Sequence, residues 1–272
     1  MTRSQLVTLL TDFGWQDVYV AVMKGVIATI NPQISVVDLT HQIPPQDLIA
    51  GRFALLNAYA YFPHGTVHIA VIDPGVGSQR RGIAIELAAG SFLVGADNGL
   101  FSGILQKERA IAKRGTGTIA VVELSNSKYW RSDRPSTTFH GRDIFAPVGA
   151  HLASGIPLKE LGKEIAIDSL VKLSLPEVTI EKNQIIGCVQ YIDRFGNLIT
   201  NIAAQNLQFR QQVFIDRQLI PWGNTYSNVK ERELIALIGS HGYLEIAVNC
   251  GNAQEKLQVT VGEIVIVLLS EK

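Results

Sequence analysis

A short apolar stretch that runs straight into a glycine-rich turn constrains the fold of this chain more than any other feature. Residues 68–72 (HIAVI) are rich in apolar and β-branched side chains, which is typical of a strand buried on both faces of a parallel sheet. The turn that follows, DPGVGSQRR at residues 73–81, carries a carboxylate, two glycines and two guanidinium groups. Open α/β sheets bind ligands beyond the carboxyl ends of their strands, so this turn predicts a site that faces such a crevice.

Two further interpretations of the same turn stay open at this point. Asp-Pro-Gly is also common turn chemistry at the end of a strand, with no ligand nearby. Gly75 and Gly77 resemble the start of a dinucleotide-binding fingerprint, but Arg80 stands where that fingerprint needs a third glycine to pack a helix against the sheet. We therefore discount dinucleotide binding.

Strands and helices alternate through the first two-thirds of the chain. Strand patterns cover residues 6–10, 34–39, 67–72, 92–96 and 118–124, and helical patterns cover residues 18–30 and 46–61. This alternation predicts parallel βαβ units. We expect an N-terminal α/β domain over residues 1–175, with a central, mostly parallel sheet flanked by helices. Asp12 is a second carboxylate at the carboxyl end of a predicted strand.

The pattern changes after about residue 173, where helical periodicity fades. Short strand patterns follow at residues 185–192, 198–202, 212–220, 234–238, 243–248 and 259–269, separated by polar turns. Many short strands with turn residues between them predict a smaller, all-β barrel domain over residues 183–272. Most turns of this kind bind nothing, so the polar turns alone indicate no ligand.

Composition and charge exclude several classes of protein. The 272 residues are 47% hydrophobic with a formal net charge of zero, which is typical of a soluble globular protein without a basic surface for nucleic acid. The apolar run before Asp12 is too short for a signal-peptide core or a membrane span, so we expect a cytoplasmic protein with no membrane partner. Cys188 and Cys250 show no metal-ligand spacing, which predicts neither a disulfide nor a zinc site.

A second informative segment lies between residues 129 and 154. There a polar, loop-like run ends in Phe139-His140-Gly141-Arg142-Asp143, directly before an apolar helix. His140 would enter the crevice where this helix begins. From this segment alone, the alternative that His140 only caps or packs the helix, with Arg142 and Asp143 forming a surface ion pair, stays open and is the more common case for a lone histidine.

Six motifs together resemble one protein family along nearly the whole chain. They are TDFG at residues 11–14, DPGVGSQRR at 73–81, ADNG at 96–99, FHGRDIFAP at 139–147, DRFGNLITN at 193–201 and LEIAVNCGNA at 244–253. Their order resembles that of the S-adenosyl-L-methionine (SAM) hydroxide adenosyltransferases, also called adenosine-forming SAM hydrolases, which are related to fluorinating and chlorinating SAM enzymes.

The resemblance implies a reaction and a set of site residues. Water attacks C5′ of the ribose of SAM and gives adenosine and methionine, with Asp73, Arg80 and His140 as the catalytic residues that hold and activate the water. Asp12 matches the position of the carboxylate that binds the ribose diol. The positions that would bind the methionine part and the adenine lie in the second domain and are Asp193, Phe195, Asn197, Ser240, Glu245 and Val248. The resemblance also implies a homotrimer whose active sites lie between subunits.

Several positions distinguish branches within the family. Halogenating relatives carry Tyr where this chain has Asp73, and Ser where it has Gly141, and the fluorinating branch has a long insertion after the turn at residues 73–81. These differences favour a hydrolase. Gln46 replaces an aromatic residue of the halogenase pocket, and His241 stands where the fluorinating enzyme has Arg, which leaves open how the substrate carboxylate is held.

The chemistry of SAM explains why these residue types suit the reaction. Its sulfonium leaves as a neutral thioether, so the nucleophile needs help and the leaving group needs no proton; SAM is the substrate, and we expect no cofactor and no metal. A metal-dependent hydrolase using Asp12, Asp73, Asp97 and His140 is a weaker hypothesis. A SAM-dependent halogenase and a non-catalytic protein that binds SAM or adenosine also stay open.

Overall fold

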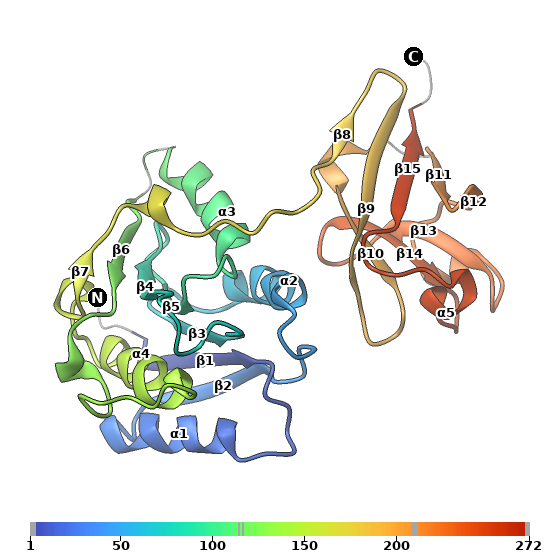
Figure 1. Ribbon diagram of the computed structural model, residues 1–272. Helices are drawn as coiled ribbons and strands as arrows, with labels where there is room; N and C mark the ends of the chain where they lie inside the picture. Colours follow the sequence, from blue (N-terminus) through green and yellow to red (C-terminus); the bar gives the residue numbers. More distant parts are fainter. Residues whose placement is uncertain (1–3, 114, 116, 208–210, 270–272) are drawn as a thin grey trace. The chain divides into compact units, whose positions relative to one another are not determined.

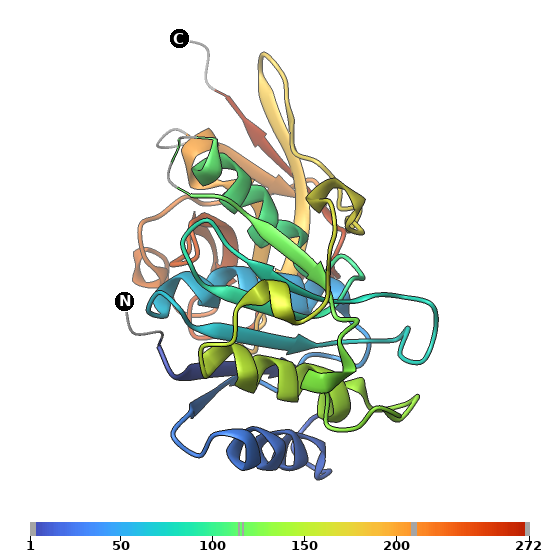
Figure 2. The same ribbon diagram turned by 90° about the vertical axis from the view of Figure 1, so that its left-hand side faces the viewer.

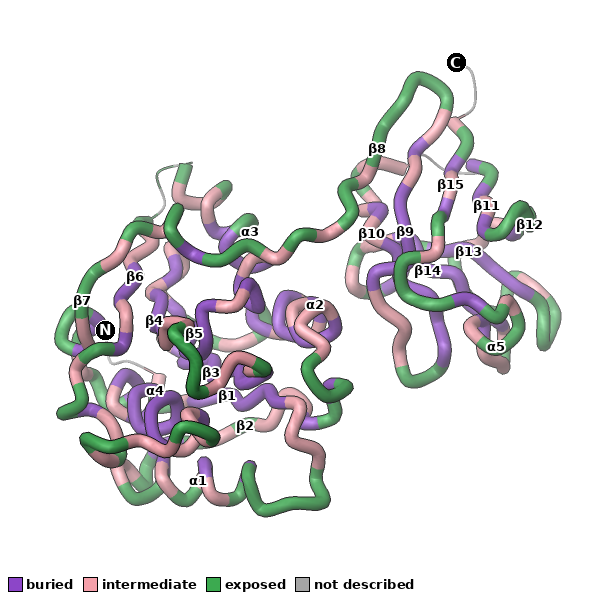
Figure 3. The backbone as a smooth tube through the Cα atoms, viewed as in Figure 1, coloured by how far each residue is buried: buried purple, intermediate pink, exposed green. Residues whose placement is uncertain are grey.

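The computed structural model describes residues 4–113, 115, 117–207 and 211–269. The chain forms two compact units, Met1–Leu173 and Ser174–Lys272 (Figure 1). Buried residues concentrate in the strands of each unit, so each unit has its own hydrophobic core (Figure 3). This confirms the expected architecture of an α/β unit followed by an all-β unit.

The first unit is built on one sheet with the strand order β2-β1-β3-β5-β4-β6-β7. Its strands are β1 (Leu6–Thr11), β2 (Ser35–Thr40), β3 (Val67–Val71), β4 (Gly82–Glu86), β5 (Phe92–Ala96), β6 (Ala120–Glu123) and β7 (Lys163–Glu164). Strands β2, β1, β3 and β5 pair in parallel, whereas β4 pairs antiparallel with both β5 and β6, and β6 pairs antiparallel with β7. The sheet is therefore mixed, and its parallel part has the carboxyl ends of β1 and β3 side by side.

Helices cover both faces of this sheet. They are α1 (Tyr19–Ile30), α2 (Leu48–Ala58), α3 (Ser102–Ala112) and α4 (Ala146–Ala153). Helices α1 and α4 lie side by side in both views (Figures 1 and 2), and they share a core cluster with Val7 and Leu9 of β1. On the opposite face, Gly51 of α2 comes so close to the Ile72 side chain that a Cβ would meet it at 2.0 Å. Burial on both faces explains the largely apolar strands.

Helix α2 is shorter than the predicted helix at residues 46–61. Gln46 has a positive φ of 66°, which is incompatible with the first turn of a helix, and Asp47 caps the helix by accepting the backbone N–H of Ala50 at 2.9 Å. After Ala58 the chain continues as a 3₁₀ turn, Tyr59–Tyr61. The helix is limited by its cap and by this tightened turn, which the Ala-rich and Leu-rich composition does not reveal.

The second unit is an antiparallel barrel-like sheet with the order β12-β11-β15-β9-β10-β14-β13. Its elements are β8 (Thr179–Ile180), β9 (Gln184–Ile192), β10 (Leu198–Ala203), β11 (Gln212–Ile215), β12 (Gln218–Ile220), β13 (Leu234–Ile238), β14 (Tyr243–Val248), α5 (Ala253–Leu257) and β15 (Ile264–Leu268). Trp222 follows β12, and it forms a β-bridge with Ala236 of β13. The bridge joins the two edge strands, so the sheet is nearly closed.

The strand predicted at residues 212–220 is in fact a hairpin. Asp216 and Arg217 between β11 and β12 have positive φ angles of 44° and 61°, as the two central residues of a type I′ turn require. Asp-Arg lacks the glycine that normally marks such a turn, so the local pattern favours one continuous strand. Among the helices of the described residues, none combines the length and the apolar character needed to cross a membrane.

Candidate active site

Asp12 and Asp73 follow two neighbouring strands at the same edge of the sheet. β1 and β3 are parallel neighbours with Thr11 opposite Val71, and each aspartate follows the end of its strand. The register therefore brings together two carboxylates that are 61 positions apart in the sequence. Both line the same cleft, at the position expected for a ligand of an α/β sheet.

Arg80 and Asp73 form a bidentate ion pair inside the 73–81 turn. Arg80 Nε donates to Asp73 Oδ1 at 3.0 Å, and Arg80 Nη2 donates to Asp73 Oδ2. The exposed fractions of the two side chains are 11% and 6%, so the pair is largely shielded from solvent. The guanidinium also lies over the ring of Phe145, with its carbon 5.4 Å from the ring centroid. Parallel hydrogen bonds and a stacked face hold Arg80 in one orientation.

His140 is the third member of this cluster. Arg80 Nη2 lies 2.6 Å from His140 Nδ1. A guanidinium can only donate, so Nδ1 must be the acceptor, and the proton of the neutral ring is then on Nε2. Burial, and after it the charge of Arg80, lower the pKa of His140 below its ordinary value of 6.5, against the opposing effect of the carboxylates of Asp73 and Asp143. His140 is therefore neutral at pH 7.

A close backbone approach explains how two distant segments meet in this cluster. Gly77 has a positive φ of 78°, and a Cβ at this position would lie 2.4 Å from the carbonyl oxygen of Thr137. The 73–81 turn thus packs against the segment that leads into His140. Only glycine fits this position, because any side chain would push the two segments apart.

Asp143 anchors the loop that carries His140. It is fully buried, and it accepts hydrogen bonds from Arg142 Nε at 2.7 Å, from Arg131 Nε at 2.5 Å and from the backbone N–H of Ser136 at 2.8 Å. Burial acts to raise the pKa of Asp143, but these hydrogen bonds hold it well below its usual range. The interpretation that Arg142 and Asp143 form only a surface ion pair is therefore wrong.

His140 stands directly before a π-helical turn, Gly141–Phe145, that leads into α4. Such turns occur frequently at functional sites, because the wider turn redirects side chains. A Cβ on Gly141 would lie 3.3 Å from both Met23 Sδ and the Phe139 ring, which is a tight fit. A serine at this position would need these neighbours to shift.

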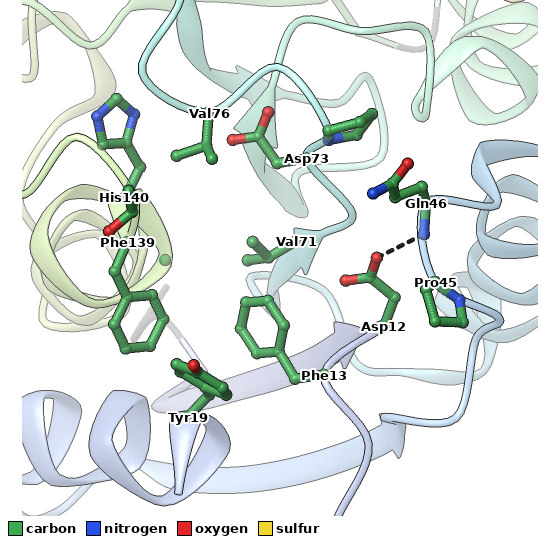
Figure 4. Close-up of a pocket in the computed structure, with 13 residues that line it drawn as sticks. Asp12, Phe13, Tyr19, Pro45, Gln46, Val71, Asp73, Val76, Phe139 and His140 are labelled. Atoms are coloured by element: carbon green, nitrogen blue, oxygen red, sulfur yellow. Dashed lines mark hydrogen bonds between the residues drawn. The ribbon is translucent and has the colours of Figure 1, made fainter. Parts of the chain in front are cut away.

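The cleft holds about 410 Å³ beside this cluster. Figure 4 shows His140 and Asp73 on one side, Asp12 with Gln46 on another, and the rings of Phe13, Tyr19 and Phe139 together along a third. The residues that line it are Asp12, Phe13, Tyr19, Pro45, Gln46, Val71, Asp73, Pro74, Val76, Thr138, Phe139, His140 and Gly141. Arg80 is not among them, and it stands behind the lining in contact with Asp73 and His140.

The three aromatic rings form one apolar wall. The centroids of Phe13 and Tyr19 are 5.5 Å apart, those of Phe13 and Phe139 are 5.8 Å apart, and those of Tyr19 and Phe139 are 5.2 Å apart. Sequence reasoning missed this wall, although Phe13 and Phe139 stand next to Asp12 and His140 in two of the six motifs. Nothing in the local pattern marked Tyr19.

Asp12 keeps room for a ligand. Among the described residues its carboxylate accepts one hydrogen bond, from the backbone N–H of Gln46 to Oδ2 at 2.8 Å. The positive φ of Gln46 is uncommon for a residue with a side chain, and this hydrogen bond helps to hold it. A carboxylate with spare acceptor positions suits a ligand with hydroxyl groups.

Asp97 does not join the cluster. It pairs with Arg81 Nη2 at 2.5 Å and accepts the backbone N–H of Val171 at 2.9 Å, so its carboxylate has structural partners. In the described ranges, no three His, Cys, Asp or Glu side chains come together as the ligands of a metal ion would. The four residues that a metal-dependent hydrolase would need are therefore not assembled.

The predicted binding residues of the barrel unit include one self-contained turn. Asp193 Oδ1 accepts the backbone N–H groups of Phe195 and Asn197 at 2.8 and 2.9 Å, and Oδ2 accepts Asn197 Nδ2 at 3.0 Å. Asn197 is buried, whereas Phe195 is 73% exposed. The turn thus holds an aromatic ring out into solvent, which costs free energy unless a partner covers the ring.

A second group surrounds Glu245 on β14. The buried carboxylate accepts the hydroxyl of Tyr226 at 2.8 Å and lies 3.0 Å from His241 Nε2. Burial and the hydrogen bond to Glu245 raise the pKa of Tyr226 to about 12. Ser240 is exposed at the neighbouring turn, while the Val248 side chain is packed in the barrel core, so only the backbone of Val248 can reach a ligand.

Two family descriptions match the chain in sequence order. Residues 7–162 match the SAM hydroxide adenosyltransferase N-terminal domain, and residues 187–266 match the SAM hydroxide adenosyltransferase C-terminal domain.

Curated relatives extend over nearly the whole chain. The (R)-S-adenosyl-L-methionine hydrolase of Salinispora tropica is 39% identical over 97% of this chain and 97% of its own. The (R)-S-adenosyl-L-methionine hydrolase of Thermus thermophilus is 38% identical over 94% of this chain and 96% of its own. A fluorinase of an Actinoplanes species is more distant, at 28% identity over 94% of this chain and 97% of its own.

Among solved structures, an uncharacterized conserved protein from Thermotoga maritima superposes with a TM-score of 0.87. It is 32% identical, and the match covers 96% of this chain and 99% of the Thermotoga chain.

Proposed function

The chain belongs to the SAM hydroxide adenosyltransferase family, and from this premise we propose that it hydrolyses SAM to adenosine and L-methionine. The observation that carries the proposal is the contact of Asp73, Arg80 and His140 at the edge of one cleft, with Asp12 across it. The identity to named SAM hydrolases over nearly the full length supports the same reaction.

The geometry indicates how a water molecule would be activated. In the structure Arg80 Nη2 donates directly to His140 Nδ1 at 2.6 Å, so a water would take the place of this hydrogen bond only when the two groups move apart. Its oxygen would then accept the N–H of Arg80. The water would give its own hydrogen to Nδ1, which is the unprotonated nitrogen of the neutral ring. A base placed in this way typically contributes roughly 10²- to 10⁴-fold to the rate.

The step balances in atoms and charge. The water oxygen forms a bond to C5′ of the ribose while the bond from C5′ to the sulfonium sulfur breaks. The electron pair of that bond goes to sulfur, which leaves as the neutral thioether of methionine. The proton of the water goes to His140, and the imidazolium that forms is stabilised by the nearby carboxylate of Asp73. No cofactor and no metal take part in this proposal.

The remaining side chains of the cleft bind and orient the substrate. Asp12 would accept hydrogen bonds from the two ribose hydroxyls, and the aromatic wall would exclude solvent from the reacting carbon. The exclusion of bulk water lowers the local dielectric and so strengthens the interaction of Arg80 with a developing hydroxide. Alignment of water with C5′ adds further rate, because effective molarities of aligned reactants reach about 10⁵ M or more.

The barrel unit would supply the rest of the substrate site. Phe195 offers an exposed ring that can stack on a purine, and Asp193, Asn197, Ser240, Glu245 and Val248 match the family positions for adenine and methionine. We extend the proposal to a homotrimer in which each site takes its α/β residues from one subunit and its barrel residues from another, and to a cytoplasmic location.

The reaction is tested with SAM in ¹⁸O-labelled water, followed by mass spectrometry of the products. The proposal predicts label in the 5′ hydroxyl of adenosine and none in methionine. The same reaction with chloride or fluoride distinguishes a halogenase, since 5′-halo-5′-deoxyadenosine would contradict the assignment. Binding of SAM without release of adenosine would indicate a non-catalytic binding protein.

The shared site is tested by mixing two variants that are each impaired at a low SAM concentration. His140→Ala disables the α/β part, and Asp193→Ala disables the barrel part. If each site combines two subunits, mixed and reassembled oligomers regain part of the activity. No recovery after verified subunit exchange would contradict a shared site, and light scattering gives the number of subunits directly.

A further inference from the structure

A series of polar contacts outside the cleft ties α1, β2 and the end of β1 together. Lys24 Nζ on α1 lies 2.6 Å from Asp38 Oδ2 on β2. His41 Nε2 lies 3.0 Å from Asp38 Oδ1, in an orientation bent away from an ideal hydrogen bond. His41 Nδ1 lies 2.8 Å from Thr11 Oγ1, and both of these side chains are fully buried. The series ends one residue before Asp12.

The Lys24–Asp38 ion pair determines where the protons lie in this series of contacts. Burial acts to raise the pKa of Asp38, but the hydrogen bond and charge of Lys24, together with His41, lower it, so Asp38 is a carboxylate at neutral pH. A carboxylate beside Nε2 favours the His41 tautomer protonated there, and Nδ1 then accepts the Thr11 hydroxyl. The Thr11 oxygen in turn accepts the backbone N–H of Phe13 at 3.2 Å.

These contacts hold the loop that carries Asp12. The Gly14 N–H donates to the backbone carbonyl of His41 at 2.7 Å, so the loop is tied to the same histidine twice, before and after Asp12. The Asp12 carboxylate itself receives the Gln46 N–H from the segment that follows His41. His41 does not line the cleft, but its contacts hold the loop that places Asp12 in the cleft.

We infer that Asp38, His41 and Thr11 are positioning residues that set the Asp12 carboxylate against the ribose of the substrate. The inference rests on the proposed function, because it assigns Asp12 to a nucleoside hydroxyl pair. Asp12 contacts no reacting atom in that assignment. Loss of the series should therefore weaken substrate binding much more than it slows the chemical step.

The chain contains its own control for this inference. Thr8 Oγ1 lies 2.8 Å from His68 Nδ1, and this second Thr–His pair is also fully buried on β1. Successive strand residues face opposite sides, so Thr8 and Thr11 point to opposite faces of the sheet. Within the described part of the chain, neither His68 Nε2 nor His41 Nε2 makes a well-aligned hydrogen bond, but a carboxylate lies beside His41 only. The His68 pair fills the core without a connection to the cleft.

The test compares Thr11→Val with Thr8→Val, because each replaces a hydroxyl by a methyl group of similar size and removes one Thr–His hydrogen bond. Both variants should lower the melting temperature. We expect Thr11→Val to raise KM for SAM about tenfold, as for a displaced binding group, with kcat within twofold of wild type. Thr8→Val should leave KM and kcat within twofold.

Further variants keep the inference testable if Thr11→Val does not fold. Asp38→Asn removes the charge that sets the His41 tautomer at a partly exposed position and should raise KM in the same way. His41→Asn keeps an acceptor near the place of Nδ1 and should retain more affinity than His41→Leu. Equal KM values for Asp38→Asn and wild type would contradict the inference, as would equal values for Thr11→Val and Thr8→Val.

The inference and the proposed function fail in different ways. If the wild-type protein releases no adenosine from SAM, the proposed reaction is wrong, and calorimetric binding of adenosine replaces KM as the measurement. Weaker adenosine binding by Thr11→Val than by Thr8→Val would still support the positioning role. Equal binding by the two variants would overturn it.

Discussion

Each unit of the molecule contains a carboxylate held by a histidine or an arginine, but the two groups differ in what remains open. In the α/β unit, Asp73 and His140 line the cleft, and Arg80 connects them from behind. In the barrel unit, Glu245 is buried, and its two oxygens face Tyr226 and His241. Two side chains of the first group line a cleft, whereas the carboxylate of the second group is buried among its own partners.

This difference between the two groups indicates that the α/β unit carries out the chemical step and that the barrel unit binds the substrate. A neutral imidazole beside a guanidinium can take a proton from water, whereas a carboxylate held by a tyrosine hydroxyl and a histidine takes part in binding and not in proton transfer. We therefore expect changes in the α/β group to lower kcat and changes in the barrel unit to raise KM. The following experiments test that division, from the largest expected effect to the smallest.

His140→Ala should reduce kcat by about 100-fold or more, because it removes the group placed to accept the proton of the water. Steady-state release of adenosine gives the rate. His151→Ala is the matched control, since His151 is a partly buried histidine of α4 outside the cleft. Unchanged kcat in His140→Ala would remove the proposed base.

The pH dependence of kcat/KM reports the state of His140 in the free enzyme. Its pKa is lowered by burial and by Arg80, and the base must be neutral to act. The rate should therefore be level at pH 7 and should fall about tenfold per pH unit only below an inflection that lies under 6.5. In Arg80→Gln the inflection should move upward, because a nearby positive charge is lost. An unmoved inflection would show that Arg80 does not act on His140.

Glu245→Gln should raise KM for SAM by about tenfold with kcat within about threefold, since uniform binding is lost and the reacting atoms are untouched. Tyr226→Phe removes one partner of the same carboxylate and serves as the milder comparison. A large loss of kcat with unchanged KM would contradict the division between the two units.

Phe195→Ala should raise KM about fivefold, the lower end of the effect of a lost base–aromatic stack. Phe195 is 73% exposed, so the melting temperature should not change. Because the side chain is exposed, a change in KM for Phe195→Ala reports substrate binding without a change in folding stability. A KM equal to that of wild type would show that the adenine does not stack on this ring.

Much of the fold was predictable because local patterns specify local structure. The strand at residues 234–238 and the one at 243–248 have the predicted bounds, and the carboxylates after β1 and β3 fall at the expected sheet edge. Strand β4 was not identified from the sequence, and its place in the sheet is decided by long-range contacts. The antiparallel insertion of β4 beside β5 makes the sheet mixed, and no periodicity in its own five residues distinguishes the two directions.

The candidate site divides in the same way. Asp12, Asp73, Arg80 and His140 were predicted from motifs, and the structure brings them to one cleft, although Arg80 stands behind its lining. The burial of Asp143 under two arginines was not predictable, because an Arg–Asp dipeptide on a helix normally faces solvent. Only the path of the 131–136 segment over the start of the helix encloses it.

The amino-acid sequence by itself determined which residue types stand at the ends of the strands, since strand and turn patterns depend on neighbours a few positions away. Tertiary structure alone decided that Arg80 bonds to both Asp73 and His140, which histidine nitrogen is free of a proton, and that one Thr–His pair supports the cleft while its counterpart on β1 fills the core. The two Thr–His pairs and the Arg80–His140 contact join atoms from segments 30 to 60 residues apart. They depend on strand register, on close backbone approach at Gly77 and on burial, which no local pattern encodes.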